Sequence, residues 1–371
     1  MELFEMEDNK LLIAREIIDK TDKEMARLFA QRMEAARLVA EYKMEHGLPI
    51  KDKAREEQII QRNAGYLSEE DELVKGFYVN FMREVIDISC KYQGRLFNGM
   101  KVAYCGINGA FASIAAGKVF PDAVRVGYSS FTEAYDAVVK GECDTAVLPI
   151  ENSSAGDVGE VCDMLFSGSL HVNATFDLSV THDLLVLPGT ELSEITRVVS
   201  HPQALMQCGK YIEEQGWETY EYVNTALAAK YVAELGDKHT AAIASEEAAA
   251  LYGLKVLQKE INESKYNTTR FAVLSAVPVV NKDKGMDKRF ILMFTVRNEA
   301  GKLASAVDII GKHGYNMQSL RSRPMKELLW QYYFFVEAEG DIYSEKGKAL
   351  MEELSSCCDK LKLVGSFSHI S

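Results

Sequence analysis

Positively charged side chains recur inside an apolar repeat near the N-terminus, and their spacing suggests an anion site. Arg32 lies seven residues after Met25 and seven before Val39, at a core position of a coiled-coil-like repeat. A buried cation needs an anionic partner, so Arg32 either sets the helix register, extends past its neighbours to water, or binds an anion. Lys43 follows 11 residues later and would project within about 20° of Arg32 on an α-helix. The two cations therefore share one face of the predicted helix.

Arg15 belongs to the same set of cations but lies too far along the helix to join the other two. It precedes Lys43 by 28 residues, which is about 42 Å along a straight helix. An antiparallel, two-fold-related partner helix would place Arg15 of one chain beside Lys43 of the other. We therefore expect a site that uses both residues to need at least a dimer.

Two further groups of polar residues have the spacing of a helix face. Asp52, Arg55 and Glu56 share one face at i, i+3 and i+4. Ser89 and Gln93 share another at i and i+4. Each residue alone would ordinarily be a solvated surface residue. Together with the three cations they suit a small dicarboxylate, because they add hydrogen-bonding groups to positive charge.

Small polar residues follow or open strand-like segments in the middle of the chain. They are Glu151-Asn152-Ser153-Ser154, Ser200-His201-Pro202-Gln203, Asn224-Thr225-Ala226 and Asn267-Thr268-Thr269-Arg270-Phe271. Ser and Asn at such places also cap helices. Several such strand ends describe a cleft between two α/β lobes, where ligands of open parallel sheets bind. Ser200 and His201 do not indicate a hydrolase, since G-x-S-x-G is missing and neighbouring side chains would point apart.

Cofactor and metal motifs are weak or missing in this sequence. The turn Gly106-Ile-Asn-Gly109 joins a strand to a helix but is not G-x-G-x-x-G. Seven Cys without a C-x-x-C pair fit reduced thiols better than disulfides or zinc. The adjacent Cys357 and Cys358 are interpreted as inert thiols. We therefore expect no cofactor and no metal.

The charge balance argues against several kinds of partner. The 371 residues include 42 Lys+Arg and 55 Asp+Glu, for a formal net charge of -13. Such an acidic chain is a poor candidate for binding nucleic acid or an anionic membrane surface. No 18-residue apolar run occurs, and the acidic first residues lack the order of a signal peptide. We expect a cytoplasmic protein.

These residues must be positioned by more than one kind of scaffold. Residues 1–95 hold only 4 of the 25 Gly and 1 of the 7 Pro, so they should be nearly all helical. The helices are predicted at about 8–45, 52–64 and 69–93. Residues from 287 onward have the β-α-β-β-α-β order of a ferredoxin-like module. Its segments are predicted at 290–296, 303–313, 317–323, 330–338, 345–359 and 361–367. The predicted domains are thus 1–95, 100–278 and 287–371.

Residues 1–95 resemble the all-helical chorismate mutases. The resemblance rests on the run LLIAREIID, Gln31-Arg32, Lys43, D-x-x-R-E at 52–56 and S-x-x-x-Q at 89–93. It implies carboxylate binding by Arg15, Arg32, Arg55 and Ser89. It implies contact with the ether oxygen of chorismate by Lys43 and Gln93, and with the ring hydroxyl by Glu56 and Asp52. The Claisen rearrangement fits this set, since it needs a compact substrate conformer and cations near an oxygen that gains negative charge.

Residues 100–278 resemble prephenate dehydratase across its catalytic domain. The resemblance rests on G-x-x-G, PIENS, SHPQ, ASE at 244–246, LYGL at 251–254 and N-x-T-R-F, with Ile107 where the family usually has Pro. It implies that Thr269 is the key catalytic group, a hydroxyl that assists departure of hydroxide. The implied site-lining residues are Glu151, Asn152, Ser153, Ser200, His201, Gln203, Thr225, Arg270 and Phe271. Arg270 would hold a carboxylate or serve as a structural ion-pair partner.

The C-terminal module resembles the ACT domain of prephenate dehydratases, which binds L-phenylalanine. The positions that match the family's two motifs are Gly301, Leu303, Ser322, Arg323 and Pro324. Lys302, Ala304 and Arg321 depart from them, and Arg321 reverses the charge of a Glu. We expect an ACT fold with weakened phenylalanine binding, or a module that mainly joins subunits.

We therefore predict a multidomain, bifunctional enzyme of L-phenylalanine biosynthesis. An all-α N-terminal domain would rearrange chorismate to prephenate, and a two-lobed α/β domain, like periplasmic binding proteins, would convert prephenate to phenylpyruvate. An α+β ferredoxin-like ACT domain would mediate feedback by L-phenylalanine. The expected partners are these small molecules and a second copy of the chain, without nucleic acid or membrane. Two alternatives remain: a small-acid sensor without turnover, which would not need Thr269 or the cation set, and a chain that kept one activity.

Overall fold

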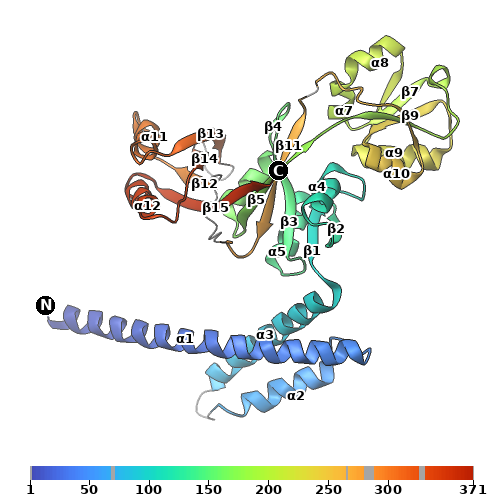
Figure 1. Cartoon of the computed structure of the whole chain (residues 1–371). Helices are drawn as coiled ribbons and strands as arrows, with labels where there is room; N and C mark the ends of the chain where they lie inside the picture. The colour runs from blue at the N-terminus through green and yellow to red at the C-terminus, as the bar shows by residue number, and fades with distance from the viewer. Residues whose placement is uncertain (1, 68–71, 265, 280–287, 326–330, 371) are drawn as a thin grey trace. The chain divides into compact units, whose positions relative to one another are not determined.

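The computed structural model describes residues 2–67, 72–264, 266–279, 288–325 and 331–370 (Figure 1). The chain divides into two compact units, residues 1–100 and residues 101–371. The second unit contains both the predicted α/β domain and the predicted ACT domain. The division of that unit into two domains stays a prediction.

The first unit consists of three helices, α1 (Glu2–Glu45), α2 (Lys53–Ala64) and α3 (Glu72–Asn98). The Asp52 carboxylate caps α2 by accepting a hydrogen bond from the Arg55 N–H at 3.0 Å. Gly99, with φ of +75°, follows α3 at a place where the left-handed conformation ends a helix. Because α3 continues to Asn98, it extends past its predicted end at residue 93. Residues 69–71, where it was predicted to begin, lie outside the described segments.

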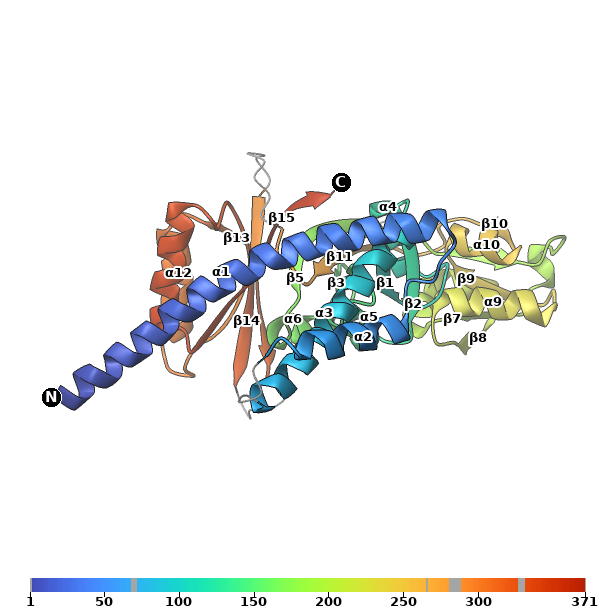
Figure 2. The same cartoon turned by 90° about the horizontal axis from the view of Figure 1, so that it is seen from below.

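Much of α1 is left exposed by the described residues of its own unit. In Figures 1 and 2 its N-terminal half extends beyond α2 and α3. Every side chain from Lys10 to Gln31 is exposed, including the repeat residues Leu11, Ile18, Met25 and Leu28. The small core of the unit consists of Ile60, Met82 and Ile86 with their neighbours.

The second unit contains one large sheet that runs through both predicted domains. Its strand order, over the described residues, is β13-β14-β12-β15-β5-β11-β3-β1-β2, with β4 paired to β3. The strands are β1 (Lys101–Cys105), β2 (Val124–Tyr128), β3 (Thr145–Asn152), β4 (Gly156–Asp157), β5 (His171–Ser179), β11 (Thr268–Ser275), β12 (Lys288–Thr295), β13 (Asn316–Pro324), β14 (Tyr332–Glu339) and β15 (Lys360–Ile370). The helices beside β1 and β3 are α4 (Phe111–Val119), α5 (Phe131–Val139) and α6 (Gly159–Ser167). Together with strands β1 to β5 and β11, these helices form the first lobe.

A second lobe is built on a separate five-stranded sheet, in the order β10-β6-β9-β7-β8. Its strands are β6 (Asp183–Val186), β7 (Arg197–Ser200), β8 (Glu218–Glu221), β9 (Thr240–Ala244) and β10 (Lys255–Gln258). Its helices are η1 (Leu192–Glu194), α7 (Pro202–Gln207), α8 (Gly209–Gln215), α9 (Thr225–Leu235) and α10 (Glu246–Tyr252). The chain enters this lobe after β5 and leaves it before β11, as Figure 1 shows.

The C-terminal module has the predicted β-α-β-β-α-β order, with α11 (Lys302–Lys312) and α12 (Glu345–Cys357) between its strands. Its last strand, β15, continues past the predicted end at residue 367 because residues 368–370 pair in parallel with β5. Gly365 permits this approach, since a Cβ there would collide with the Val172 carbonyl. Residue 330, where the strand that corresponds to β14 was predicted to begin, lies outside the described residues.

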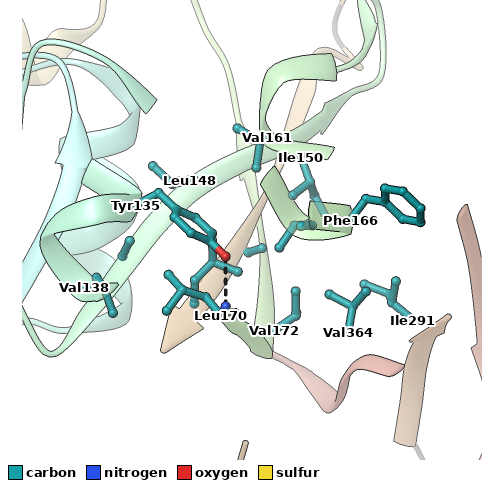
Figure 3. Close-up of a cluster of buried hydrophobic side chains, with 14 of the residues drawn as sticks. Tyr135, Val138, Leu148, Ile150, Val161, Phe166, Leu170, Val172, Ile291 and Val364 are labelled. Carbon is teal, nitrogen blue, oxygen red and sulfur yellow. Dashed lines mark hydrogen bonds between the residues drawn. The ribbon is translucent and has the colours of Figure 1, made fainter. Parts of the chain in front are cut away.

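The join between the module and the first lobe is a shared hydrophobic core (Figure 3). Ile291 and Val364 from the module pack with Leu148, Ile150 and Val172 from the lobe. The Tyr135 hydroxyl accepts a hydrogen bond from the Leu170 N–H at 2.8 Å inside this core. The first lobe and the module are therefore packed as one body.

Candidate active sites

In the helical unit, two residues of the predicted anion site, Arg32 on α1 and Ser89 on α3, are in contact. The Arg32 guanidinium donates to the Ser89 hydroxyl and to the Val85 carbonyl on α3. Partial burial lowers the pKa of Arg32 from its ordinary value. Of the alternatives left open for Arg32, extension into water is therefore not what the structure shows, because Arg32 contacts a polar group on another helix.

Three more predicted residues, Lys43, Glu56 and Gln93, lie one on each of the three helices. The Lys43 ammonium donates to the Ile50 carbonyl, and Glu56 accepts a weak hydrogen bond from the Cys90 thiol at 3.7 Å. Gln93 is buried, and its Oε1 has no hydrogen-bond partner in the described part of the chain. An unpaired buried amide oxygen is costly, so this group is ready to receive a donor.

Cys90 was not predicted from the sequence, although it follows Ser89 directly. Its pKa is raised by burial first and then by the carboxylate of Glu56. A neutral thiol beside Glu56 adds no charge to the site. The only sequence signal for it was its position on the helix that carries Ser89 and Gln93.

The structure does not bring every predicted residue of this site together. Arg15 is exposed on the uncovered part of α1, and Arg55 is exposed on α2. Asp52 is exposed and serves as the cap of α2. Within one chain, Arg32, Lys43, Glu56, Ser89 and Gln93 are buried or half-buried, whereas Arg15 is exposed.

In the α/β unit, Thr269 lies on β11 between β3 and β5, directly opposite Asn152. The Asn152 Nδ2 donates to the Thr269 hydroxyl oxygen at 2.9 Å. The Asn152 Oδ1 accepts from the backbone N–H groups of Ser154 at 3.0 Å and Ala155 at 2.9 Å. Asn152 is thereby fixed at both ends of its amide, and it orients the Thr269 hydroxyl.

Three residues that were not predicted from the sequence as site residues extend this contact. Asn152 Nδ2 donates to Asn267 Oδ1 at 2.8 Å, and Asn267 Nδ2 donates to Gln207 Oε1 at 3.0 Å. The same Gln207 oxygen lies 2.8 Å from His182 Nε2. Asn267 was visible in its motif, but Gln207 and His182 come from other segments, and only the fold places them here.

A pocket of about 170 Å³ borders this group. Its lining residues are Ser154, Met206, Gln207, Asn262, Glu263, Ser264 and Asn267. They come from the first lobe, from the second lobe and from the return connection between β10 and β11. The pocket thus lies where the sequence predicted a cleft between lobes.

Other predicted cleft residues support the backbone around the site. The Ser153 hydroxyl donates to the Tyr266 carbonyl at 2.7 Å and accepts from the Thr268 N–H at 2.9 Å. Ser200 is fully buried and donates to the Ile243 carbonyl, and the His201 ring caps α7 at the Gln203 N–H. Ser200 and His201 therefore engage different partners, as predicted for neighbours. Thr225 is the first residue of α9.

Three other predicted site residues make structural contacts instead: Arg270, Phe271 and Glu151. Arg270 forms an ion pair with Asp177 at 2.9 Å and with Glu337 of the C-terminal module at 3.4 Å. This geometry supports the structural ion-pair interpretation of Arg270. Phe271 is buried in the core, with 2% of its surface exposed. Glu151 pairs with Arg321 at 2.6 Å.

Two arginines from the second motif of the C-terminal module lie at its contact with the first lobe. Arg321 bonds Asp157 as well as Glu151, and Arg323 lies 3.3 Å from Asp163. Ser322 and Pro324 alternate with these arginines on β13 and are exposed, whereas Leu303 is half-buried on α11. Gly301, with φ of +85°, precedes α11 in a conformation that favours glycine.

The Gly106–Gly109 turn has a structural use. Gly106 and Gly109 have φ of +108° and +88°. A Cβ at Gly109 would lie 3.3 Å from the Leu251 side chain, so the turn fits closely against α10. Among the described residues, no helix is both long and apolar enough to cross a membrane, and no cluster of His, Cys, Asp and Glu has metal-binding geometry.

Comparison with known proteins gives two family matches. Residues 14–94 match the family Chorismate mutase type II, and residues 102–278 match the family Prephenate dehydratase. A bifunctional chorismate mutase/prephenate dehydratase from Enterobacter agglomerans is 31% identical, over 97% of this chain and 96% of its own.

Two solved structures share the fold of the second unit. Prephenate dehydratase from Arthrobacter aurescens, in complex with L-Phe, is 26% identical with a TM-score of 0.67, covering 72% of this chain and 90% of its own. A chain described as GqqA, a novel type of quorum quenching acylase, is 29% identical with a TM-score of 0.67, covering 73% and 98%.

Proposed function

This chain belongs to the family of bifunctional chorismate mutase/prephenate dehydratases, and we propose how its residues divide the two reactions. The helical unit rearranges chorismate to prephenate. The two α/β lobes then remove water and carbon dioxide from prephenate to give phenylpyruvate, on the route to L-phenylalanine.

For the rearrangement, the helices supply charge and shape rather than an acid or a base. Arg32 and Ser89 are already paired, and their free hydrogen-bonding capacity suits a substrate carboxylate. Lys43 and Gln93 are assigned to the ether oxygen, where negative charge grows as the C–O bond breaks. Because an ether oxygen only accepts hydrogen bonds, Gln93 is assigned to donate to it from Nε2, and the unpaired, buried Oε1 leaves the amide able to accept a further hydrogen bond.

The exposed apolar face of α1 supports a mutase built from two chains. Leu11 is 51% exposed, Ile17 is 62% exposed and Ile18 is 55% exposed. Contiguous exposed apolar surface of this kind marks an interaction site. A second copy packed in antiparallel fashion would cover it and place Arg15 beside the partner's cation set.

For the dehydration, the observation that carries the assignment is the hydrogen bond from Asn152 to Thr269. The Thr269 oxygen accepts this bond, so its own proton is free to be donated to another oxygen. In the reaction, the electrons of the C–C bond to the ring carboxylate move into the ring as carbon dioxide departs. The ring C–O bond breaks at the same time, and hydroxide leaves as water after taking up a proton. Thr269 assists by donating its hydroxyl proton in a hydrogen bond to that oxygen.

The C-terminal module is assigned as an ACT domain that binds L-phenylalanine. Its ferredoxin-like order and the phenylalanine complex of the Arthrobacter aurescens protein support this. Gly301, Leu303, Ser322 and Pro324 are the proposed ligand residues. Arg323 matches the family motif too, although here it binds Asp163 of the first lobe.

The test is to incubate the purified full chain with chorismate and to follow prephenate and phenylpyruvate by chromatography. Phenylpyruvate formed from chorismate by one protein supports both assignments. Accumulated prephenate that is never consumed would mean that only the mutase works. Tight binding of either acid without any product would instead support a sensor.

A further inference from the structure

A chain of hydrogen bonds runs from the backbone beside Asn152 to the buried His182, and its direction is fixed at one end. The N–H groups of Ser154 and Ala155 can only donate, so Asn152 must present Oδ1 to them. Its Nδ2 therefore faces both Thr269 and Asn267.

The same reasoning fixes the orientation of two more side-chain amides, those of Asn267 and Gln207. Asn267 must accept from Asn152, so its Oδ1 faces that residue and its Nδ2 faces Gln207. Gln207 must then present Oε1 to Asn267, and this oxygen also faces His182 Nε2. An acceptor there requires that the His182 proton be on Nε2.

His182 is itself fixed in position at the end of this series of hydrogen bonds. Only 3% of its surface is exposed, and it directly precedes β6, where the chain crosses into the second lobe. Its backbone N–H donates to Asn262 Oδ1 at 3.0 Å, and its carbonyl accepts from the Ile261 N–H at 2.8 Å. Both bonds join it to the return connection between the lobes.

The surroundings of the ring favour the neutral form. The Phe111 ring lies edge-on at 5.8 Å between centroids. His182 Nδ1 has no hydrogen-bond partner among the described residues, so a proton there would be a buried, unsatisfied donor. Burial lowers the pKa of His182, in the same direction.

We propose that His182 is a positioning residue for the dehydration. As a neutral imidazole with its proton on Nε2, it holds Gln207 in one orientation. Gln207 then orients Asn267 and Asn152, so that the Thr269 proton stays free for the leaving hydroxyl. This inference rests on the proposed role of Thr269.

The experiment compares His182→Leu, which removes the donor, with His182→Gln, which restores an N–H group near the Nε2 position. In the full chain, we expect His182→Leu to lower the dehydratase kcat about tenfold or more, with KM changed less than about twofold. His182→Gln should recover kcat to within about threefold of the natural protein. His239→Leu is the matched control, because the His239 side chain is exposed and, among the described residues, its ring hydrogen-bonds only the Glu194 carbonyl, away from the lobe connections.

A spectroscopic readout tests the proton position without relying on activity. In ¹⁵N-histidine-labelled full chain, the long-range ¹H–¹⁵N signals that disappear in His182→Gln should be those of an Nε2–H neutral ring. A charged ring or an Nδ1–H ring would overturn the proposal. So would a kcat for His182→Leu equal to that of the natural protein, or a His182→Gln kcat as low as that of His182→Leu. Should His182→Leu not fold, as judged by lost mutase activity and circular dichroism, the His182→Gln rate and the spectrum still decide.

Thr269→Ala, assayed in parallel, separates the two levels of the argument. If Thr269→Ala dehydrates prephenate normally, the proposed role of Thr269 fails. If Thr269→Ala is inactive while His182→Leu is normal, only the inference about His182 fails. In the double variant, His182→Leu should add no further loss, because the chain acts through Thr269.

Discussion

The two units of this protein differ in how much of a site one chain contains. In the α/β unit, Thr269 lies in a hydrogen-bond chain that begins and ends within the same unit. In the helical unit, the cation set is divided, with Arg32 paired to Ser89 and Arg15 exposed on an uncovered helix. A site on a packed sheet can take all its residues from one chain. A site on a long exposed helix, as we propose for the mutase, also needs residues from the second chain that packs on that helix.

The largest expected effect is at Thr269. Thr269→Ala removes the hydroxyl that donates to the leaving oxygen, and we expect dehydratase kcat to fall about 10²- to 10⁴-fold. Mutase activity of the same protein should be unchanged, because that site lies in the other unit. Thr268→Ala is the control one residue away. Dehydration by Thr269→Ala at the natural rate would remove Thr269 from the mechanism.

The matching change in the helical unit is Lys43→Ala. It removes the cation assigned to the ether oxygen, and one lost electrostatic contact of this kind lowers kcat about 10²- to 10³-fold. The rate of chorismate loss checks this, with prephenate dehydration as the internal control. Lys91→Ala, on the exposed side of α3, should leave the mutase rate as it is. Mutase activity that survives Lys43→Ala would refute the ether-oxygen assignment.

A smaller effect is expected where the first lobe meets the C-terminal module. Glu337 is 1% exposed and receives both Arg270 and Arg289. Glu337→Gln should lower the free energy of unfolding of the second unit by about 2–3 kcal/mol, because charge-assisted hydrogen bonds are lost inside the protein.

Urea unfolding followed by tryptophan fluorescence and circular dichroism would measure the change. Glu339→Gln, at the exposed end of the same strand, is the matched control, with a change within about 0.5 kcal/mol. Equal stabilities for the two variants would show that the buried ion pairs add nothing to the join between lobe and module.

The sequence predicted most local structure because the signals for it are local. Asp52 lies at the predicted start of a helix, and it caps that helix through its own near neighbours. The succession of strand-like and helix-like segments in the C-terminal module likewise predicted its element order.

Contacts between segments that lie far apart in the sequence could not be predicted from it. The parallel pairing of residues 368–370 with β5 joins segments almost 200 residues apart, and nothing in either segment specifies it. Arg321 was recognised as a charge reversal, but its partners Glu151 and Asp157 follow only from the packing of the module on the lobe. Arg270 likewise had two interpretations until its neighbours were in place.

The candidate dehydratase site was predicted in part. Thr269 and Asn152 were named from their motifs, and the structure places them in contact. Gln207 and His182 were missed because a lone Gln on a helix and a lone His before a strand are ordinary in any sequence. The two residues come into contact only in the fold, where the chain segments that connect the two lobes lie side by side.

The most direct test of the contrast between the units is complementation between two inactive mutases. An Arg15→Ala chain and a Lys43→Ala chain are mixed under conditions in which subunits exchange, and prephenate formation from chorismate is measured. If the mutase site is built from two chains, heterodimers contain one intact site, and part of the natural activity returns, while the dehydratase rate stays constant throughout. If subunits exchange and no mutase activity returns, the site does not combine Arg15 and Lys43 from different chains, and the contrast drawn here is wrong.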